Sequence, residues 1–137
     1  MLKVKDIMTE NVISVRKETP IYEALELMAE NDITGIPIVR EDMTLVGILS
    51  EKDVLQLFYA RKGEEDKTVD DFMTRPAIHF DEDESLLDVC DCLMENHFRR
   101  VPVTSKGKLV GIISRRDLLK YIIQLRNESQ VPTDTSH

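Results

Sequence analysis

One eight-residue pattern occurs twice in this chain, at residues 46–53 and again at residues 110–117. In each copy an apolar stretch typical of a strand leads to a Ser, and an Asp follows three residues later, where a helix is predicted to begin. Aligning the two copies also aligns the segments that precede them, residues 4–9 with 69–74 and residues 36–38 with 101–103. The chain is therefore an internal duplication.

The duplication limits the size of the folding unit. The chain has 137 residues, and a repeat of roughly 55 residues buries too little apolar surface to be stable alone. We therefore expect the two copies to share a core in one pseudo-symmetric domain. The expected boundaries are repeat 1 at 1–60, a linker at 61–67, repeat 2 at 68–126 and a flexible tail at 127–137.

Both repeats predict the same order of elements, β-α-β-β-α, which is an α/β class with mixed α+β character. In the first repeat we expect a strand at 12–15, a helix opened by an N-cap at Thr19 and by Pro20, a hairpin of 36–39 and 45–49, and a helix at 50–59. In the second repeat we expect strands at 78–80, 101–103 and 109–113 and helices at 85–96 and 114–126.

Charge and cysteine content exclude several classes of protein. With 18 Lys+Arg against 26 Asp+Glu, the net charge is -8, which argues against nucleic acid as a partner because such binding needs a basic face. No apolar run is long enough to insert in a membrane, and we expect a cytoplasmic protein. Cys90 and Cys92 lie two residues apart in a helical stretch, which suits reduced thiols better than a metal site.

The Ser and Asp of each copy, Ser50 with Asp53 and Ser114 with Asp117, have two interpretations. In the first they form only a capping box at a helix start. In the second the same junction faces a cleft, where the carboxylate can accept hydrogen bonds from both hydroxyls of a ribose. The residues alone leave these alternatives open.

Arg99 and Arg100 directly precede a predicted buried strand, and guanidinium groups bind phosphate well. The alternative is a surface pair that neutralises acids such as Glu95. The matching residues of the first repeat are Thr34 and Gly35, so the two halves differ chemically. We find no set of residues that suggests a catalytic site or a Gly-rich phosphate loop.

The repeated Gly-φ-φ-Ser-x-x-Asp motif (φ is apolar), the Pro-containing strand before it and the Asp-φ-Met-Thr lead-in resemble a CBS domain pair, the Bateman module. The resemblance covers about residues 1–124. It implies two clefts between pseudo-two-fold repeats that bind an adenosine nucleotide, AMP, ADP or ATP, as a regulatory ligand. It also implies a homodimer.

The resemblance implies one cleft for each motif. We expect the stronger nucleotide site to use Met8, Ile13, Thr34, Gly35, Arg99, Arg100, Ile112, Ser114 and Asp117. We expect the weaker site to use Ile48, Ser50, Asp53, Met73 and Ile78, with Arg100 as a candidate opposite them. We prefer the site of Ser114 and Asp117, because the second repeat, which contains this motif, also carries the two arginines.

The function that the resemblance implies is a stand-alone regulatory module that binds a nucleotide and signals to an unidentified partner protein. The alternatives are an S-adenosylmethionine sensor, and an assembly module whose clefts are vestigial. We expect no enzyme activity, catalytic cofactor or metal.

Overall fold

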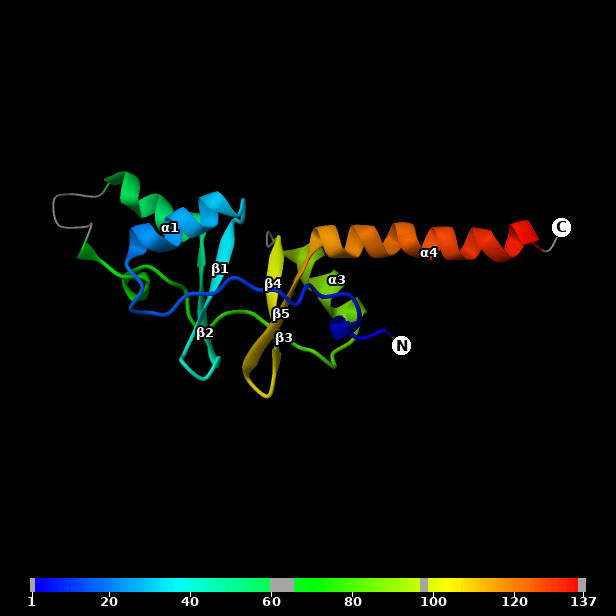
Figure 1. Ribbon diagram of the computed structural model, residues 1–137, viewed down its shortest axis with the longest axis horizontal. Coiled ribbons are helices and arrows are strands. Elements are labelled where there is room, and N and C mark those ends of the chain that lie inside the picture. Colours follow the sequence, from blue (N-terminus) through cyan, green and yellow to red (C-terminus); the bar gives the residue numbers. More distant parts are fainter. Residues whose placement is uncertain (1, 60–65, 97–98, 136–137) are drawn as a thin grey trace.

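The computed structural model describes residues 2–59, 66–96 and 99–135, with side chains described to residue 129. Two units of similar order lie side by side (Figure 1). The first contains α1 (Ile21–Glu30), β1 (Gly35–Val39), β2 (Leu45–Ser50), α2 (Glu51–Val54) and the 3-10 helix η2 (Leu55–Tyr59). The second contains β3 (Phe80–Asp81), α3 (Leu86–Glu95), β4 (Arg100–Ser105), β5 (Lys108–Ser114) and α4 (Arg115–Thr135).

Both predicted hairpins form, and they are irregular at the same place. β1 pairs antiparallel with β2, and β4 with β5, with the central proline of each first strand, Pro37 or Pro102, opposite an Ile of the motif. Each ladder shifts register just beyond that proline, between Ile38 and Val39 in one and between Val103 and Thr104 in the other. The duplication is therefore preserved down to the hydrogen-bond register.

The first strand of each repeat is shorter than expected. In the second repeat β3 covers two residues and pairs parallel with β4. In the first repeat the strand expected at 12–15 is reduced to one bridge, between Val15 and Ile38. Val12 and Ile13 instead line a cleft that is described below. Within the described residues, the three-stranded sheet is complete in the second repeat and two-stranded in the first.

Each apolar core is completed by the lead-in of the other repeat. The 3-10 helix η1 (Val4–Asp6) buries Val4 in the core of the second repeat, and η4 (Val69–Asp71) buries Val69 in the core of the first. Both valines are fully buried, which stabilises the fold by about 1.5–3 kcal/mol for each side chain. The two lead-ins therefore cross between the repeats and join them.

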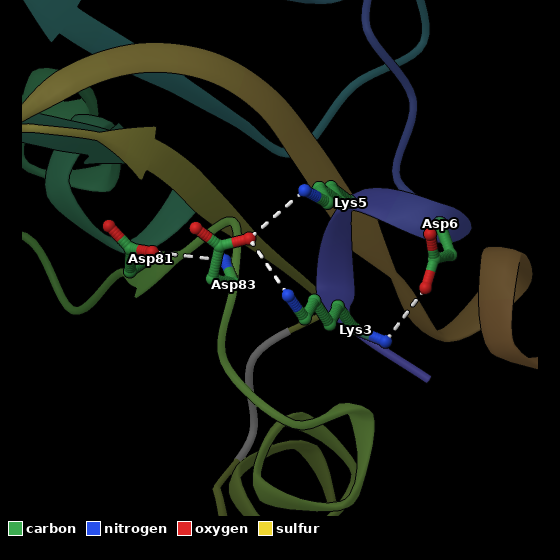
Figure 2. A network of polar contacts seen from close by, with 5 residues as sticks. All are labelled: Lys3, Lys5, Asp6, Asp81 and Asp83. Carbon is green, nitrogen blue, oxygen red and sulfur yellow. Dashed lines mark hydrogen bonds and ion pairs between the residues drawn. The ribbon is translucent and has the colours of Figure 1, made fainter. Parts of the chain in front are cut away.

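Charged residues also hold the first lead-in against the second repeat, as Figure 2 shows. Lys3 and Lys5 lie 3.5 and 3.1 Å from a carboxylate oxygen of Asp83, and the backbone N–H of Val4 donates to the carbonyl of Glu84. The hydrogen bond from Lys5 lowers the pKa of Asp83 and raises the pKa of Lys5. The acidic run before α3 thus has lysine partners in the lead-in.

The tips of the two hairpins are joined as well. The N–H of Leu45 donates to the carbonyl of Gly107 at 3.1 Å, and the N–H of Leu109 donates to the carbonyl of Met43 at 2.9 Å. The first repeat has one residue more than the second between its Pro-containing segment (36–38, aligned with 101–103) and its motif, and Met43, with a φ of 72°, lies in that turn. The insertion is therefore absorbed where the hairpins meet, without changing either ladder.

Several helix boundaries differ from the sequence prediction. Thr19 does not cap α1: Pro20 is the N-cap, and the N–H of Ile21 donates to the carbonyl of Lys67. The helix expected at 50–59 becomes 3-10 after Val54. The last helix does not end at Arg126, because α4 continues to Thr135 and extends beyond the rest of the fold (Figure 1). Most of the expected linker, and residues 136–137 of the tail, lie outside the described residues.

Candidate functional site

The two Ser-x-x-Asp motifs lie at equivalent strand-to-helix junctions, β2 to α2 and β5 to α4. The N–H of Ser50 donates to Oδ2 of Asp53 at 2.9 Å, and the N–H of Ser114 donates to Oδ2 of Asp117 at 2.8 Å. In return the Asp N–H donates to the Ser hydroxyl, at 3.4 Å in the first motif and 3.2 Å in the second. Both motifs therefore form the predicted capping box.

Capping does not account for the second oxygen of each carboxylate. Oδ1 of Asp53 accepts a hydrogen bond from the hydroxyl of Thr74 at 2.9 Å, and Oδ1 of Asp117 accepts one from Thr9 at 3.1 Å. Each threonine comes from the lead-in of the other repeat. Each motif aspartate thus connects its own helix to the opposite repeat.

The backbone of each lead-in runs directly over the motif glycine of the other repeat. Thr9 exchanges two backbone hydrogen bonds of 2.8 Å with Ile112, and Thr74 exchanges bonds of 2.9 and 3.0 Å with Ile48. A Cβ on Gly47 would lie 2.6 Å from the carbonyl oxygen of Thr74, and one on Gly111 would lie 3.0 Å from that of Thr9. This close approach explains why the motif has Gly at these positions.

We expect Thr9→Val and Thr74→Val each to lower the free energy of unfolding by about 0.5–1.5 kcal/mol, because each removes one hydrogen bond between the repeats. The two losses should add in the double variant, since the pairs share no partner. Urea denaturation measures both. Thr68→Val is the control, because its hydroxyl makes only a 3.4 Å contact to Asp71 three residues away. Urea midpoints of the Thr9 and Thr74 variants equal to that of wild type would contradict the expectation.

A cleft of about 270 Å³ lies beside Asp117, and we call it the Asp117 cleft. Of the residues expected in the stronger site, six line it: Ile13, Gly35, Arg100, Ile112, Ser114 and Asp117. Met8, Thr34 and Arg99 do not line it. Met8 instead packs against the core of the second repeat, with its side chain over Gly111.

A larger cleft of about 590 Å³ lies beside Asp53, the Asp53 cleft. Ile48, Ser50 and Asp53 line it as expected, together with Thr34, Arg99 and Arg100 from around the Pro-containing strands. The other two expected residues lie elsewhere, because Met73 packs against the core of the first repeat and Ile78 is 52% exposed. The larger cleft therefore belongs to the motif that was expected to be weaker.

Arg100 lies where the sequence predicted, but Arg99 does not. Arg100 lines both clefts, whereas of the two clefts Arg99 lines the Asp53 cleft alone. Arg99 belongs to the second repeat but therefore lies at the motif of the first. Within the described residues the Nε atom of Arg100 is buried and has no hydrogen-bond partner. A buried donor in this state favours an acceptor supplied from outside the chain.

Sequence reasoning missed the cations that α4 brings to the Asp117 cleft. Arg116 and Lys120 line this cleft, and they lie four residues apart on the same side of the helix. The position of Arg116, immediately before the motif Asp, is the signal that could have indicated it. Arg115 points elsewhere, because its guanidinium donates to the carbonyls of Leu93 and Asn96 at the end of α3.

The described residues hold no group of three or more His, Cys, Asp or Glu side chains placed for a metal ion. Burial raises the pKa of the Cys90 and Cys92 thiols, so their reactive thiolate forms are disfavoured. In the described part of the chain we also find no helix with the length and apolarity needed to cross a bilayer.

Comparison with known proteins finds relatives that match most of this chain. An uncharacterized protein of Methanocaldococcus jannaschii, MJ1225, is 38% identical over 119 residues; the match covers 87% of this chain and 42% of the relative. The structure of CBSX2 in complex with AMP, a protein of Arabidopsis thaliana, is 33% identical with a TM-score of 0.83, covering 92% of this chain and 99% of that one.

A second structure is the CBS domain pair of MJ0100 in complex with 5′-methylthioadenosine and S-adenosyl-L-methionine. It is 28% identical with a TM-score of 0.75, and the match covers 89% of this chain and 96% of that one. Enzymes also match, but only in part: inosine-5′-monophosphate dehydrogenase of Thermoplasma acidophilum is 35% identical, and the match covers 22% of that enzyme.

The model of the CBS domain family matches residues 4–60 and 69–124, one match for each repeat. The two matches begin at the lead-ins that cross between the repeats, and each includes one motif. With its two motifs, its exchanged lead-ins and its paired clefts, this chain belongs to the CBS domain family as a tandem pair.

Proposed function

We propose that this protein is a regulatory module that binds adenosine nucleotides in its two clefts and signals their presence to a partner protein. The observation that carries the proposal is that both motif carboxylates line clefts in addition to capping their helices. The AMP complex of CBSX2 and the S-adenosyl-L-methionine complex of MJ0100 support an adenosine-type ligand.

In the Asp117 cleft we assign the ribose to Asp117 and Ser114. One lone pair of Asp117 Oδ1 remains beside the bond from Thr9, so a ribose hydroxyl can donate to it. Ile13 and Ile112 offer apolar surface for the base, and Arg100 supplies a buried donor for a phosphate. In the Asp53 cleft we assign the ribose to Asp53 and Ser50, with Ile48 against the base.

The hydrogen bonds in each cleft suggest how a ligand would act on the repeats. The ribose would share or replace the bond between Thr9 and Asp117, which connects the lead-in of one repeat to α4 of the other. A ligand can shift a conformational equilibrium only if it binds one arrangement better than another. An altered setting of the lead-ins is the change that a partner would recognise.

Thermal denaturation with AMP, ADP, ATP and S-adenosylmethionine tests the proposal. A ligand at ~100-fold above its Kd stabilises the folded state by about 2.7 kcal/mol, which we expect for at least one adenosine nucleotide. A higher melting temperature with S-adenosylmethionine alone would favour the alternative that the protein is an S-adenosylmethionine sensor. No shift with any of them at millimolar concentration would favour an assembly module with vestigial clefts.

We further propose that the protein forms a homodimer through apolar residues on its helices. Met94 of α3 and Phe58 of η2 are 83% and 84% exposed, and Leu119 and Ile122 of α4 are exposed as well. Burial of such surface against a second copy would be favourable. Light scattering should give twice the mass of the chain, and Ile122→Asp should reduce it; a monomeric wild type would contradict the proposal.

The two thiols are consistent with a reducing compartment. Cys90 and Cys92 are free in the structure, and disulfides are rare in the cytoplasm. We place the protein there, and we assign it no catalytic role, because its clefts bring together no activated nucleophile or acid–base pair among the described residues.

A further inference from the structure

The two clefts differ in charge although they arise from the same motif. The Asp117 cleft is lined by three cations, Arg100, Arg116 and Lys120, and by one carboxylate, that of Asp117. The Asp53 cleft is also lined by three cations but has three carboxylates, those of Glu51, Asp53 and Glu95. A cleft with a surplus of one charge sign concentrates ligands of the opposite sign. The Asp117 cleft is therefore the more favourable place for a highly charged anion.

The surplus comes from the sequence of α4 and has no equivalent in the first repeat. Arg116 and Lys120 align with Lys52 and Gln56, so the second cation of the helix is replaced by a neutral side chain. Within the part of the chain that the structure describes, neither Arg116 nor Lys120 makes an ion pair. Both charges are therefore available to a ligand.

Arg100 cannot account for the difference, because it lines both clefts. Its positive charge can favour an anion in one cleft or the other. The cations that distinguish the clefts are thus Arg116 and Lys120 in the Asp117 cleft and Arg99 and Lys52 in the Asp53 cleft. In the Asp53 cleft, the carboxylates of Glu51 and Glu95 offset these positive charges.

We propose that the Asp117 cleft is a site for an adenosine polyphosphate, whose terminal phosphates are held by Arg116 and Lys120. The Asp53 cleft takes an adenosine ligand without a polyphosphate. This assignment rests on the proposed function and adds to it the class of ligand for each cleft. The sequence also favoured the Asp117 cleft for the phosphate, because of Arg99 and Arg100. The structure supports the same cleft for a different reason, the cations Arg116 and Lys120 of α4.

Titration calorimetry with metal-free ATP and with adenosine tests the assignment. The background is Asp53→Ala, which leaves only the Asp117 cleft intact. There we expect Arg116→Gln with Lys120→Gln to raise the Kd for ATP by about tenfold or more, while the Kd for adenosine changes by less than about twofold. In the Asp117→Ala background, Lys52→Gln should change the ratio of the two Kd values by less than about twofold.

A control variant separates a local effect from a change of net charge. Arg40→Gln with Lys106→Gln also removes two positive charges, at exposed residues that line neither cleft. It should leave the preference for ATP over adenosine intact. If the variant of Arg116 and Lys120 also retains that preference, or loses adenosine as strongly as ATP, the assignment is wrong while the proposed function stands. If wild type binds neither ligand, both are wrong.

Discussion

Asp117→Ala and Asp53→Ala are each expected to remove one of two AMP-binding sites, and the double variant is expected to bind no AMP. A carboxylate that accepts two hydrogen bonds from a ribose contributes about 3 kcal/mol or more, so its loss weakens binding by about a hundredfold. Calorimetric titration measures this as a fall in stoichiometry from two ligands per chain to one, and then to none.

The control for this experiment is Asp71→Ala, because each motif aspartate also caps a helix. Asp71 accepts hydrogen bonds from the N–H and the hydroxyl of Thr68, at 2.9 and 3.4 Å, and it lines neither cleft. Its replacement removes a similar cap, which costs about 1 kcal/mol, and should leave both AMP sites. Unchanged AMP binding in the double variant of Asp53 and Asp117 would show that these residues only cap helices.

Gly47→Ala is expected to be the most destabilising single change in the motifs. The added methyl would lie 2.6 Å from the carbonyl oxygen of Thr74, and backbone cannot move away as a side chain can. The second lead-in would have to separate from β2 and lose its two hydrogen bonds to Ile48. We expect a loss of up to about 3 kcal/mol, or about 10 °C in melting temperature.

The other glycines provide graded controls for this prediction. A Cβ on Gly111 would first meet the sulfur of Met8, a flexible side chain, at 2.5 Å, so Gly111→Ala should cost less. A Cβ on Gly35 would have no atom nearer than 3.6 Å, and Gly35→Ala should change stability by less than about 0.5 kcal/mol. Equal melting temperatures for the three variants would mean that the lead-ins do not press against the motifs.

Sequence reasoning predicted the repeated architecture well because each repeat shows its own pattern. The hairpins, the helix after Ser85 and the fold class follow from local periodicity and turn residues. The exchange of lead-ins could not be read in this way, because Val4 and Val69 carry no sign of which core they enter. The cap expected at Thr19 was wrong because the carbonyl of Lys67 provides a tertiary alternative.

The candidate site was predicted less completely than the fold. The motif residues line the clefts as expected, since their place at a strand-to-helix junction is local information. The distribution of the cations is not local: Arg99 lies in the cleft of the opposite motif, and Lys120 enters the Asp117 cleft only because α4 begins beside it. Chemistry that depends on two repeats meeting requires the three-dimensional arrangement.

A crystal structure of the protein with AMP tests the central claim most directly. We predict AMP in the clefts, with its ribose hydroxyls about 2.6–3.0 Å from the carboxylate oxygens of Asp53 and Asp117. AMP bound elsewhere would contradict this prediction. Clefts that stay empty at saturating AMP, with both carboxylates keeping only their present bonds within the chain, would contradict it as well.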